Sequence, residues 1–378
     1  AIRENLAADN RATGMIALGL RSKVMEQVGR LHETAQLCRQ IVQYADEQNS
    51  VSQALAGSGY IGLGMVLYEW NDLVEARLAV EKGIDLGQQW ANLQDLMIGY
   101  TILALILQAQ HQTGAATEAY EQAERALQAL AQENLTIPWV PPFVAGVGAR
   151  LALRQGRLGT AERWAQERDL HADTYLPQSK RHFYEFVYLT LARILMAQGR
   201  LDEARQILDR ALPQAEAEGR MSSIVEIHLL RALLFQAEGS HTHAQEALQT
   251  SLSLAMPEGF MRVYLDEGAP LRTLLIRFRE HQPQGSTLRQ YATSLLAAFD
   301  RPYAPLSVPG DTLIEPLSER EHEVLHLLSQ GKSNQEIARH LIVAVSTVKT
   351  HIHHLFAKLQ ATDRLQAVTR ARELGLLG

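Results

Sequence analysis

Apolar residues recur at intervals of three and four positions along most of this chain, and short turns of small or polar residues interrupt them. Around Gly199, the apolar positions are Leu189, Ala192, Leu195 and Met196 before the glycine and Ala204, Ile207, Leu208 and Leu212 after it. This spacing places the side chains on one face of a helix. Glycine commonly ends a helix because it adopts a left-handed backbone conformation without strain. The pattern therefore predicts two helices joined by a tight turn at Gly199.

The same arrangement of a turn and a following alanine occurs six times. The turns begin at Gly29, Asn71, Gly114, Gly156, Gly199 and Gly239, and the equivalent alanines are Ala35, Ala76, Ala119, Ala161, Ala204 and Ala244. Successive alanines are 40 to 43 residues apart. Because one helix pair cannot bury its apolar face alone, the repetition predicts an all-α solenoid in which each pair packs against its neighbours. The array resembles the tetratricopeptide class of repeats, although its period is longer than the ~34 residues usual there.

Proline interrupts this pattern at residues 135–143, where Pro138, Pro141 and Pro142 surround Trp139. A helix is not expected to continue through these residues, because proline lacks the amide hydrogen that a helix interior requires. Two interpretations stay open for the segment. It is either a long loop between repeats or a loop whose Trp139 ring meets a ligand.

A second proline-rich stretch, residues 301–316, marks the clearest domain boundary in the chain. Its composition is typical of a semi-extended linker. The predicted organisation is a helical-repeat domain at residues 1–300, a proline-rich linker at 301–315 and a small C-terminal domain at 316–378.

Two capping boxes mark the starts of helices after this linker. Ser318 with Glu321, and Ser333 with Glu336, each place a serine at the N-cap and a glutamate three residues later. In such a pair, each side chain binds the backbone amide of the other residue. The second box begins a short helix, and a longer helix that ends near Leu359 follows it. Two helices joined in this way predict a helix-turn-helix.

The longer helix has two chemically different faces. One face carries Val348, Ile352, Leu355 and Leu359, and the opposite face carries Ser346, Thr350, His353 and Ala357. The apolar face predicts the side that packs against the core of the domain. The small polar face, with Lys349 at its flank, suits insertion into the major groove of DNA.

The candidate DNA-binding residues differ in what they can recognise. Lys349 can reach guanine O6 and N7 or a phosphate, and Thr350 can touch a thymine methyl group. His353 can donate a hydrogen bond to a base, and Lys358 is expected to contact a phosphate. The complete candidate set is Asn334, Ser346, Thr347, Lys349, Thr350, His353 and Lys358.

These motifs resemble the LuxR-type helix-turn-helix module. The matching residues are Leu317-Ser318-Glu319-Arg320-Glu321, Gly331-Lys332-Ser333-Asn334-Gln335-Glu336-Ile337-Ala338, Thr347-Val348-Lys349-Thr350-His351 and Lys358-Leu359. The resemblance implies a small four-helix domain whose long helix reads bases through Lys349, Thr350 and His353. It also implies that the helix near residues 364–374 pairs two modules. Ala344 stands where the family usually has serine, which weakens this N-cap by about 1 kcal/mol.

The upstream part resembles the MalT-like subgroup of large ATP-binding LuxR regulators. The residues that carry this resemblance are Ala192-Arg193, Gly199-Arg200, Gly219-Arg220, Pro257-Glu258-Gly259-Phe260-Met261-Arg262 and Asp266-Glu267-Gly268. The resemblance implies that the repeats receive a small-molecule inducer or an inhibitory protein. In that subgroup an ATP-binding module precedes the repeats. No cofactor is expected in this chain itself. ATP binding is expected only through an N-terminal module, which these residues do not include.

Charge and composition agree with a DNA-binding C-terminal part. The net charge of the chain is −6, but residues 314–378 hold eight Lys and Arg and seven Asp and Glu, together with six of the 14 His. This part is therefore the one that a phosphate backbone does not repel. A single cysteine, Cys38, fits a reducing cytoplasm. No apolar run is long enough for a membrane span, so a cytoplasmic protein without membrane contact is expected.

Other candidate chemistry is weaker. His351 and His354 lie three residues apart but have no nearby partner at metal-ligand spacing, so no metal site is expected. Asp266 and Glu267 are expected to be solvated or capping carboxylates. No nucleophile with a neighbouring base is visible, and we expect no enzymatic activity.

An aromatic cluster in the fifth repeat leaves two interpretations open, core packing or part of an effector pocket. The cluster consists of Phe183, Tyr184, Phe186 and Tyr188, with Arg181 and His182 as polar neighbours. The candidate effector-binding residues are Trp139, Arg181, His182 and Tyr184.

The expected function is a transcriptional regulator of bacterial type, and an activator. The repeats would sense a small-molecule inducer or a regulatory protein, and the C-terminal domain would bind double-stranded promoter DNA as a dimer or higher homo-oligomer. RNA polymerase is an expected partner. The alternative is a repeat-based protein-interaction scaffold whose helix-turn-helix serves docking.

Overall fold

The computed structural model describes residues 11–46, 50–133, 135, 140–173, 181–300, 319–329 and 332–341, and the single positions 348, 352, 355, 367 and 371. These residues belong to two units, Ala1–Pro302 and Tyr303–Gly378. The described residues form helices and turns and contain no strand, so the all-α prediction is confirmed. None of the described helices is both long enough and apolar enough to cross a membrane.

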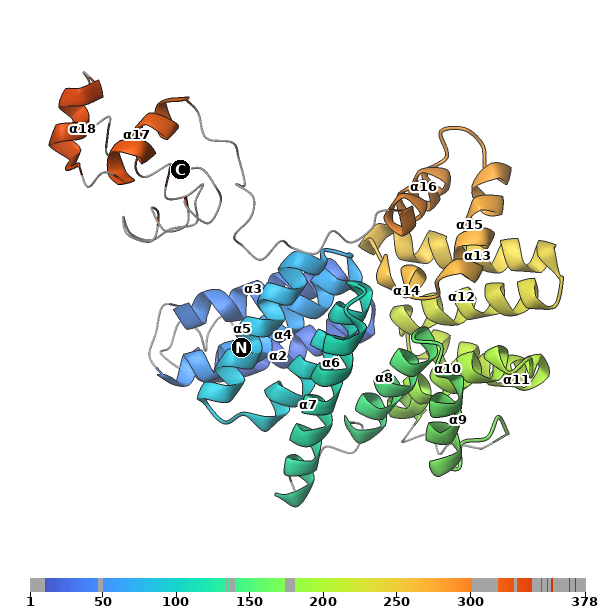
Figure 1. Cartoon of the computed structure of the whole chain (residues 1–378). Coiled ribbons are helices and arrows are strands. Elements are labelled where there is room, and N and C mark those ends of the chain that lie inside the picture. Colours follow the sequence, from blue (N-terminus) through green and yellow to red (C-terminus); the bar gives the residue numbers. More distant parts are fainter. Residues whose placement is uncertain are drawn as a thin grey trace. The chain divides into compact units, whose positions relative to one another are not determined.

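Figure 1 shows the helices of the first unit, coloured from blue to orange along the chain. In chain order they are α2 (Arg11–Gln27), α3 (Leu31–Asp46), α4 (Ser50–Glu69), α5 (Leu73–Gln89), α6 (Leu93–Ala109), α7 (Thr113–Gln132), α8 (Val140–Arg154), α9 (Leu158–Glu167), α10 (Arg181–Ala197), α11 (Leu201–Ala217), α12 (Met221–Ala237), α13 (His241–Ala255), the 3₁₀ helix η2 (Met256–Glu258), α14 (Arg262–Leu265), α15 (Ala269–His281) and α16 (Thr287–Asp300). The second unit contains α17 (Glu319–Ser329) and α18 (Asn334–Leu341).

Helices α2 to α13 form the six predicted pairs, α2 with α3 through to α12 with α13. Within each pair a tight turn joins the two helices. The first helices of successive pairs contact one another in the order α2, α4, α6, α8, α10 and α12. Each pair therefore buries its apolar face against its neighbours, as a helical-repeat array requires.

The repeated alanine is buried at all six predicted positions, and the most exposed is Ala119 at 6%. The turns at Gly29, Gly156, Gly199 and Gly239 have positive φ, as predicted. The third turn differs from the prediction, because Gly114 lies inside α7 and His111, with a φ of 60°, takes the turn position. Histidine is among the residues that tolerate this conformation, so glycine is not required there. Ala116, which is fully buried, then takes the place in the repeat that Ala119 was predicted to have.

The proline-rich segment at residues 135–143 is more helical than predicted. Helix α8 begins at Val140, so Pro141 and Pro142 lie in its first turn. In the first turn the missing amide hydrogen of proline removes no intrahelical hydrogen bond. The prediction of a loop through residue 143 is therefore wrong at its C-terminal end. Trp139 and Pro138 lie outside the described residues.

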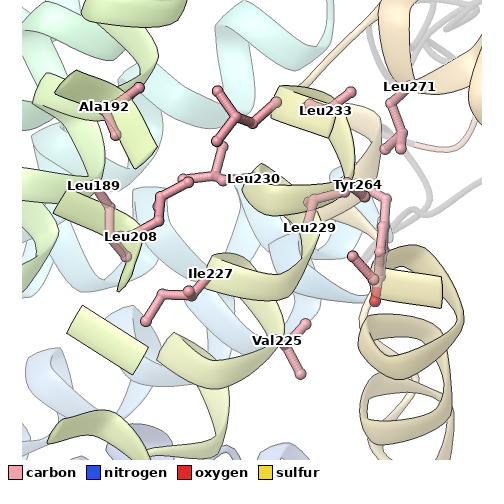
Figure 2. Packing of buried hydrophobic residues seen from close by; sticks show 14 of the residues in the cluster. Leu189, Ala192, Leu208, Val225, Ile227, Leu229, Leu230, Leu233, Tyr264 and Leu271 are labelled. Atoms are coloured by element: carbon pink, nitrogen blue, oxygen red, sulfur yellow. The ribbon is translucent and has the colours of Figure 1, made fainter. Parts of the chain in front are cut away.

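The largest hydrophobic cluster of the first unit extends from the second half of the repeats to α16. In Figure 2, Leu230 of α12 lies between Leu189 of α10 and Tyr264 of α14. All three side chains are almost completely buried. Leu31, Ala35 and Val66, which come from the first two pairs, belong to the same cluster. The N-terminal and C-terminal parts of this unit are therefore in direct contact.

That contact involves a short stretch after the last pair. Residues 256–267, called the closing segment below, comprise η2, the connecting residues 259–261, α14 and the adjoining Asp266 and Glu267. Helix α14 contacts α4, and α12 contacts α2. On its other side the closing segment lies against α13, α15 and α16. The closing segment thus joins the end of the repeat array to its beginning.

Candidate nucleic-acid interface and charged network

The second unit has its own hydrophobic core. The described buried residues that form it are Val324, Leu325, Leu327, Leu328, Ile337, Ala338, Val348, Leu355, Ala367 and Ala371. They come from α17, from α18 and from helical positions further along the chain. The unit therefore has a core to which each of its described helical parts contributes.

The start of α18 has the predicted capping box. The backbone amide of Ser333 donates to the Glu336 carboxylate at 2.8 Å, and the Glu336 amide donates to the Ser333 hydroxyl at 3.4 Å. The Ser333 hydroxyl also donates to the Glu336 carboxylate at 2.7 Å. This pairing satisfies amides that the first turn of a helix would otherwise leave without an acceptor. Asn334, one of the candidate DNA-binding residues, is the first residue of α18 and is half-buried.

The predicted core face of the following helix is confirmed where the structure describes it. Val348 and Leu355 are fully buried, and Ile352 packs partly buried against the same core. The candidate residues Ser346, Thr347, Lys349, Thr350, His353 and Lys358 lie outside the described residues, so their contacts with DNA stay a prediction.

The candidate effector-binding residues are only partly located. Arg181, His182 and Tyr184 lie in the first turns of α10, but their side chains are outside the described residues, as is Trp139. Two neighbours on α10 are described. Tyr188 is buried in the core cluster, and Phe186 packs partly buried against Phe143 at a ring distance of 5.2 Å. For Phe186 and Tyr188 the structure therefore shows core packing.

A charged network lies beside these aromatic residues in the interior of the first unit. Its members come from four helices and the closing segment, and they are Tyr68, Glu69, Arg150, Arg154, Arg193, Glu226, Arg262, Asp266 and Glu267. The prediction that Asp266 and Glu267 are solvated or capping carboxylates is wrong. Their side chains are only 9% and 12% exposed, and arginines from other helices surround them.

Asp266 is the most highly bonded carboxylate of the network. It accepts hydrogen bonds from the Tyr68 hydroxyl at 2.6 Å and from the guanidinium groups of Arg154 and Arg262. Burial alone would raise the pKa of the Asp266 carboxyl, but the two arginines outweigh burial and hold the pKa below its usual value. Burial and the Asp266 charge raise the pKa of the Tyr68 hydroxyl to about 12. Asp266 is therefore ionised, and Tyr68 acts as a neutral donor.

Arg193 connects the closing segment to α12. It donates to Glu267 at 2.8 Å and to Glu226 at 2.7 Å. Arg150 also binds Glu226, at 2.7 Å, and its guanidinium lies 3.8 Å from the centre of the Phe186 ring. Burial would raise the pKa of Glu226, but the two arginines lower it below its usual value. Paired buried charges of this kind hold helices in one relative position because an unpaired buried charge is unfavourable.

Glu69, the last residue of α4, binds the closing segment in two ways. Its backbone carbonyl accepts from the Met261 amide at 3.0 Å, and its carboxylate accepts from the Val263 amide at 3.0 Å. Burial raises the pKa of the Glu69 carboxyl to about 8, against the opposing effect of the Val263 hydrogen bond. The negative charge of Asp266 adds to the upward shift. Glu69 is therefore largely protonated in the folded protein at neutral pH.

Sequence reasoning did not identify this network. Helical periodicity leads to the expectation that charged residues lie at the surface. It does not indicate which residues of distant repeats pair. One signal was present, because Arg150 and Arg193 each have apolar residues directly before and after them in the sequence. A charge in such surroundings indicates a buried partner. The described residues include no group of three His, Cys, Asp or Glu side chains that could hold a metal ion.

Comparisons with known proteins match both units. The family model described as "MalT-like TPR region" matches residues 1–281. The model described as "Bacterial regulatory proteins, luxR family" matches residues 315–371, which include the capped helix α18.

Individual relatives are longer than this chain. The chain is 30% identical over 327 residues to the HTH-type transcriptional regulator MalT of Yersinia enterocolitica. It is 28% identical over 328 residues to the protein of the same name from Vibrio cholerae. Each alignment covers 82% of this chain and 35% of the relative. The chain therefore spans about a third of the length of these relatives.

Proposed function

The chain belongs to the family of the MalT-like TPR region, with a LuxR-family domain at its C-terminal end, and from this premise we propose that it is a DNA-binding transcriptional regulator. The unit Tyr303–Gly378 binds promoter DNA, with the polar face of its long helix in the major groove. The observation that supports this proposal is the burial of Val348 and Leu355, the predicted core face of that helix, from which we infer that the opposite face meets DNA. The relatives are named HTH-type transcriptional regulators, which supports the same function.

The finer parts of the proposal concern assembly and signal. We propose an activator that binds its promoter as a dimer or higher homo-oligomer and acts with RNA polymerase. One module of near-neutral charge gains little from the phosphate backbone, so affinity would come from several modules bound together. The repeat unit would receive a small-molecule effector or a regulatory protein.

Selection from random duplexes, followed by affinity measurements, tests DNA recognition. We expect wild-type protein to enrich a defined site and Lys349→Ala to weaken binding by about 1–3 kcal/mol, roughly 5- to 150-fold. Affinity should also fall as salt rises, because phosphate contacts release counterions. Lys82→Ala, which removes an exposed charge from α5 in the other unit, is the control and should bind like wild type.

Two results would contradict the proposal. Binding that ignores both salt and the Lys349→Ala substitution would exclude the groove geometry. Failure to enrich any duplex would favour the alternative, a repeat-based interaction scaffold whose helix-turn-helix serves docking.

Thermal stability tests the sensing role of the repeat unit. A ligand that binds only the folded state at 100 times its dissociation constant stabilises that state by about 2.7 kcal/mol. We therefore expect one class of metabolite to raise the melting temperature of the first unit in the full chain. A broad metabolite screen without such a shift would indicate a protein partner instead.

A further inference from the structure

The contact between α4 and the closing segment is made largely by polar groups. On the α4 side, Tyr68, Glu69 and Trp70 make hydrogen bonds to residues that lie 188 to 198 positions later in the chain. The Trp70 indole donates to the carbonyl of Glu258 at 2.9 Å. Asn71, in the turn after α4, accepts from Arg262 at 3.1 Å. Water can replace each of these bonds when the contact opens, which lowers the free energy required for opening.

The closing segment is held differently on its other side, where its contacts combine apolar burial with hydrogen bonds. Tyr264 is fully buried, and its hydroxyl is 2.9 Å from the Ser251 hydroxyl of α13. Its ring meets that of Tyr291 of α16 edge to face at 6.3 Å. Phe260 is also buried, and its carbonyl accepts from the Tyr291 hydroxyl. The segment is therefore anchored to the C-terminal helices by side chains that water cannot replace without loss of apolar burial.

The apolar contribution from the N-terminal pairs is smaller. Leu31, Ala35 and Val66 belong to the main hydrophobic cluster, and Leu63 and Trp70 pack partly buried against it. The remaining buried residues of that cluster come from α8 and later helices. Helices α2 to α7 also contribute to three further apolar clusters, two of which extend into α8, and none of the three includes a residue of the closing segment.

We propose that the contact between the end of α4 and the closing segment opens and closes in the folded protein, with the closing segment remaining on α13 and α16. In the open state the first helix pairs stay folded on their own clusters and separate from α14. The inference concerns the repeat unit alone and does not rest on DNA binding by the second unit.

Hydrogen exchange tests this inference on the full chain, because neighbouring amides report different contacts. The amides of Met261 and Val263 donate to Glu69 across the contact. The amides of Tyr264 and Leu265 donate to the Met261 carbonyl within the closing segment and serve as internal controls. Exchange is measured residue by residue at several low urea concentrations, together with the amides of α12.

Opening predicts that Met261 and Val263 exchange faster than Tyr264, Leu265 and the α12 amides, with a smaller urea dependence. The inference would be overturned if the amides of Met261 and Val263 showed the same free energy of opening, and the same dependence of that free energy on urea, as the α12 amides. It would show that the contact breaks only when the whole unit unfolds. A chain that binds DNA and gives this result would refute the opening while leaving the proposed function intact.

The variant Tyr68→Phe gives a second test that does not depend on absolute rates. It removes the hydroxyl that donates to Asp266 and keeps the ring, so exchange of Met261 and Val263 should accelerate about fivefold, as expected for the loss of one ordinary hydrogen bond. Exchange in α12 should not change. Tyr100→Phe, which removes an exposed hydroxyl bonded to Gln88, is the matched control. Equal acceleration in α12 and in the closing segment would mean that Tyr68 stabilises the whole unit, against the proposal.

Discussion

Asp266 accepts hydrogen bonds from residues of three different helices, namely Tyr68 of α4, Arg154 of α8 and Arg262 of α14. Apolar positions such as Leu189 and Leu208 were predictable from sequence, because helical periodicity reports which residues face the core. Buried charges were not, because their burial depends on partners that only the folded chain brings near. At the scale of residues, the sequence therefore predicted the apolar interior and missed its charged part.

Removal of the Asp266 carboxylate should strongly destabilise the first unit. In Asp266→Ala, Arg154 and Arg262 keep their charges in a buried place without their main acceptor, which we expect to lower the free energy of unfolding by about 3–5 kcal/mol. Urea unfolding followed by circular dichroism measures this change. Asp300→Ala, which breaks the exposed pair with Arg272, should change stability by less than about 1 kcal/mol. Similar effects of the two substitutions would contradict the central position that we give to Asp266.

The pH dependence of stability should reflect Glu69. Its pKa is raised from 4.5 to about 8 in the folded state, so the folded state binds the Glu69 proton more tightly than the unfolded chain does. The contribution of this group to the free energy of unfolding should therefore be complete below about pH 4.5 and should be lost as the pH rises through about 8. Among its charged neighbours, Arg262 favours the ionised form of Glu69, whereas Asp266 and Glu226 disfavour it.

The substitution Glu69→Gln isolates this contribution, since the amide oxygen can still accept from Val263 and carries no charge. We expect the decline of stability between pH 4.5 and 8 to be shallower in Glu69→Gln than in wild type, measured by urea unfolding at each pH. Part of the decline in stability should remain in Glu69→Gln, because burial also raises the pKa of Glu26 to about 7 and that of Asp95 to about 6. The exposed Glu118→Gln is the control. Parallel pH profiles for Glu69→Gln and wild type would contradict the assignment.

At the scale of helices, close approach within a pair depends on small residues. Gly64 of α4 faces α5 so closely that an added methyl group would lie 2.4 Å from a Val80 side-chain carbon and 3.0 Å from the Ala76 carbonyl oxygen. The sequence predicted small residues at Ala76 and its equivalents but did not identify Gly64. It also placed the third turn at Gly114 instead of His111, because a motif of small residues matched nearby.

These two glycines give a paired prediction. Gly64→Ala should destabilise the first unit by about 1–3 kcal/mol, because the methyl group forces α4 and α5 apart. Gly114→Ala, inside α7 with no atom within 4 Å of the added group, should stabilise it by roughly 0.5–1 kcal/mol. Thermal unfolding of both variants measures the difference. Stabilisation by both substitutions would show that α4 and α5 can separate without loss.

At the scale of the whole molecule, each hydrophobic cluster of the described residues lies within one unit, the largest in Ala1–Pro302 and another in Tyr303–Gly378. Local patterns in the sequence were sufficient to predict both the repeat array and the helix-turn-helix. They were not sufficient to predict the contact of α4 with the closing segment, because no local pattern specifies a partner 190 residues away. The buried face of the helix that follows α18 was predictable, and Val348 and Leu355 confirm it.

Separate clusters predict separate unfolding. Scanning calorimetry of the full chain should show two transitions, and Ser333→Ala should lower only the one that belongs to the second unit. Loss of this N-cap is expected to remove about 1 kcal/mol, because the Glu336 amide loses its acceptor. Thr250→Ala, which removes a hydroxyl from exposed α13 surface, is the control. A single cooperative transition that Ser333→Ala moves as a whole would contradict this prediction.

The bond between Glu69 and Val263 also has a consequence for synthesis. Its two residues are 194 positions apart, and a ribosome that adds roughly 5–20 residues per second needs about 10–40 s to reach the second after the first. During that interval the nascent α4 presents Tyr68, Glu69 and Trp70 without the segment that covers them. Two neighbouring nascent chains can exchange these segments, so closure of the repeat unit is a step exposed to domain swapping between chains on one polysome.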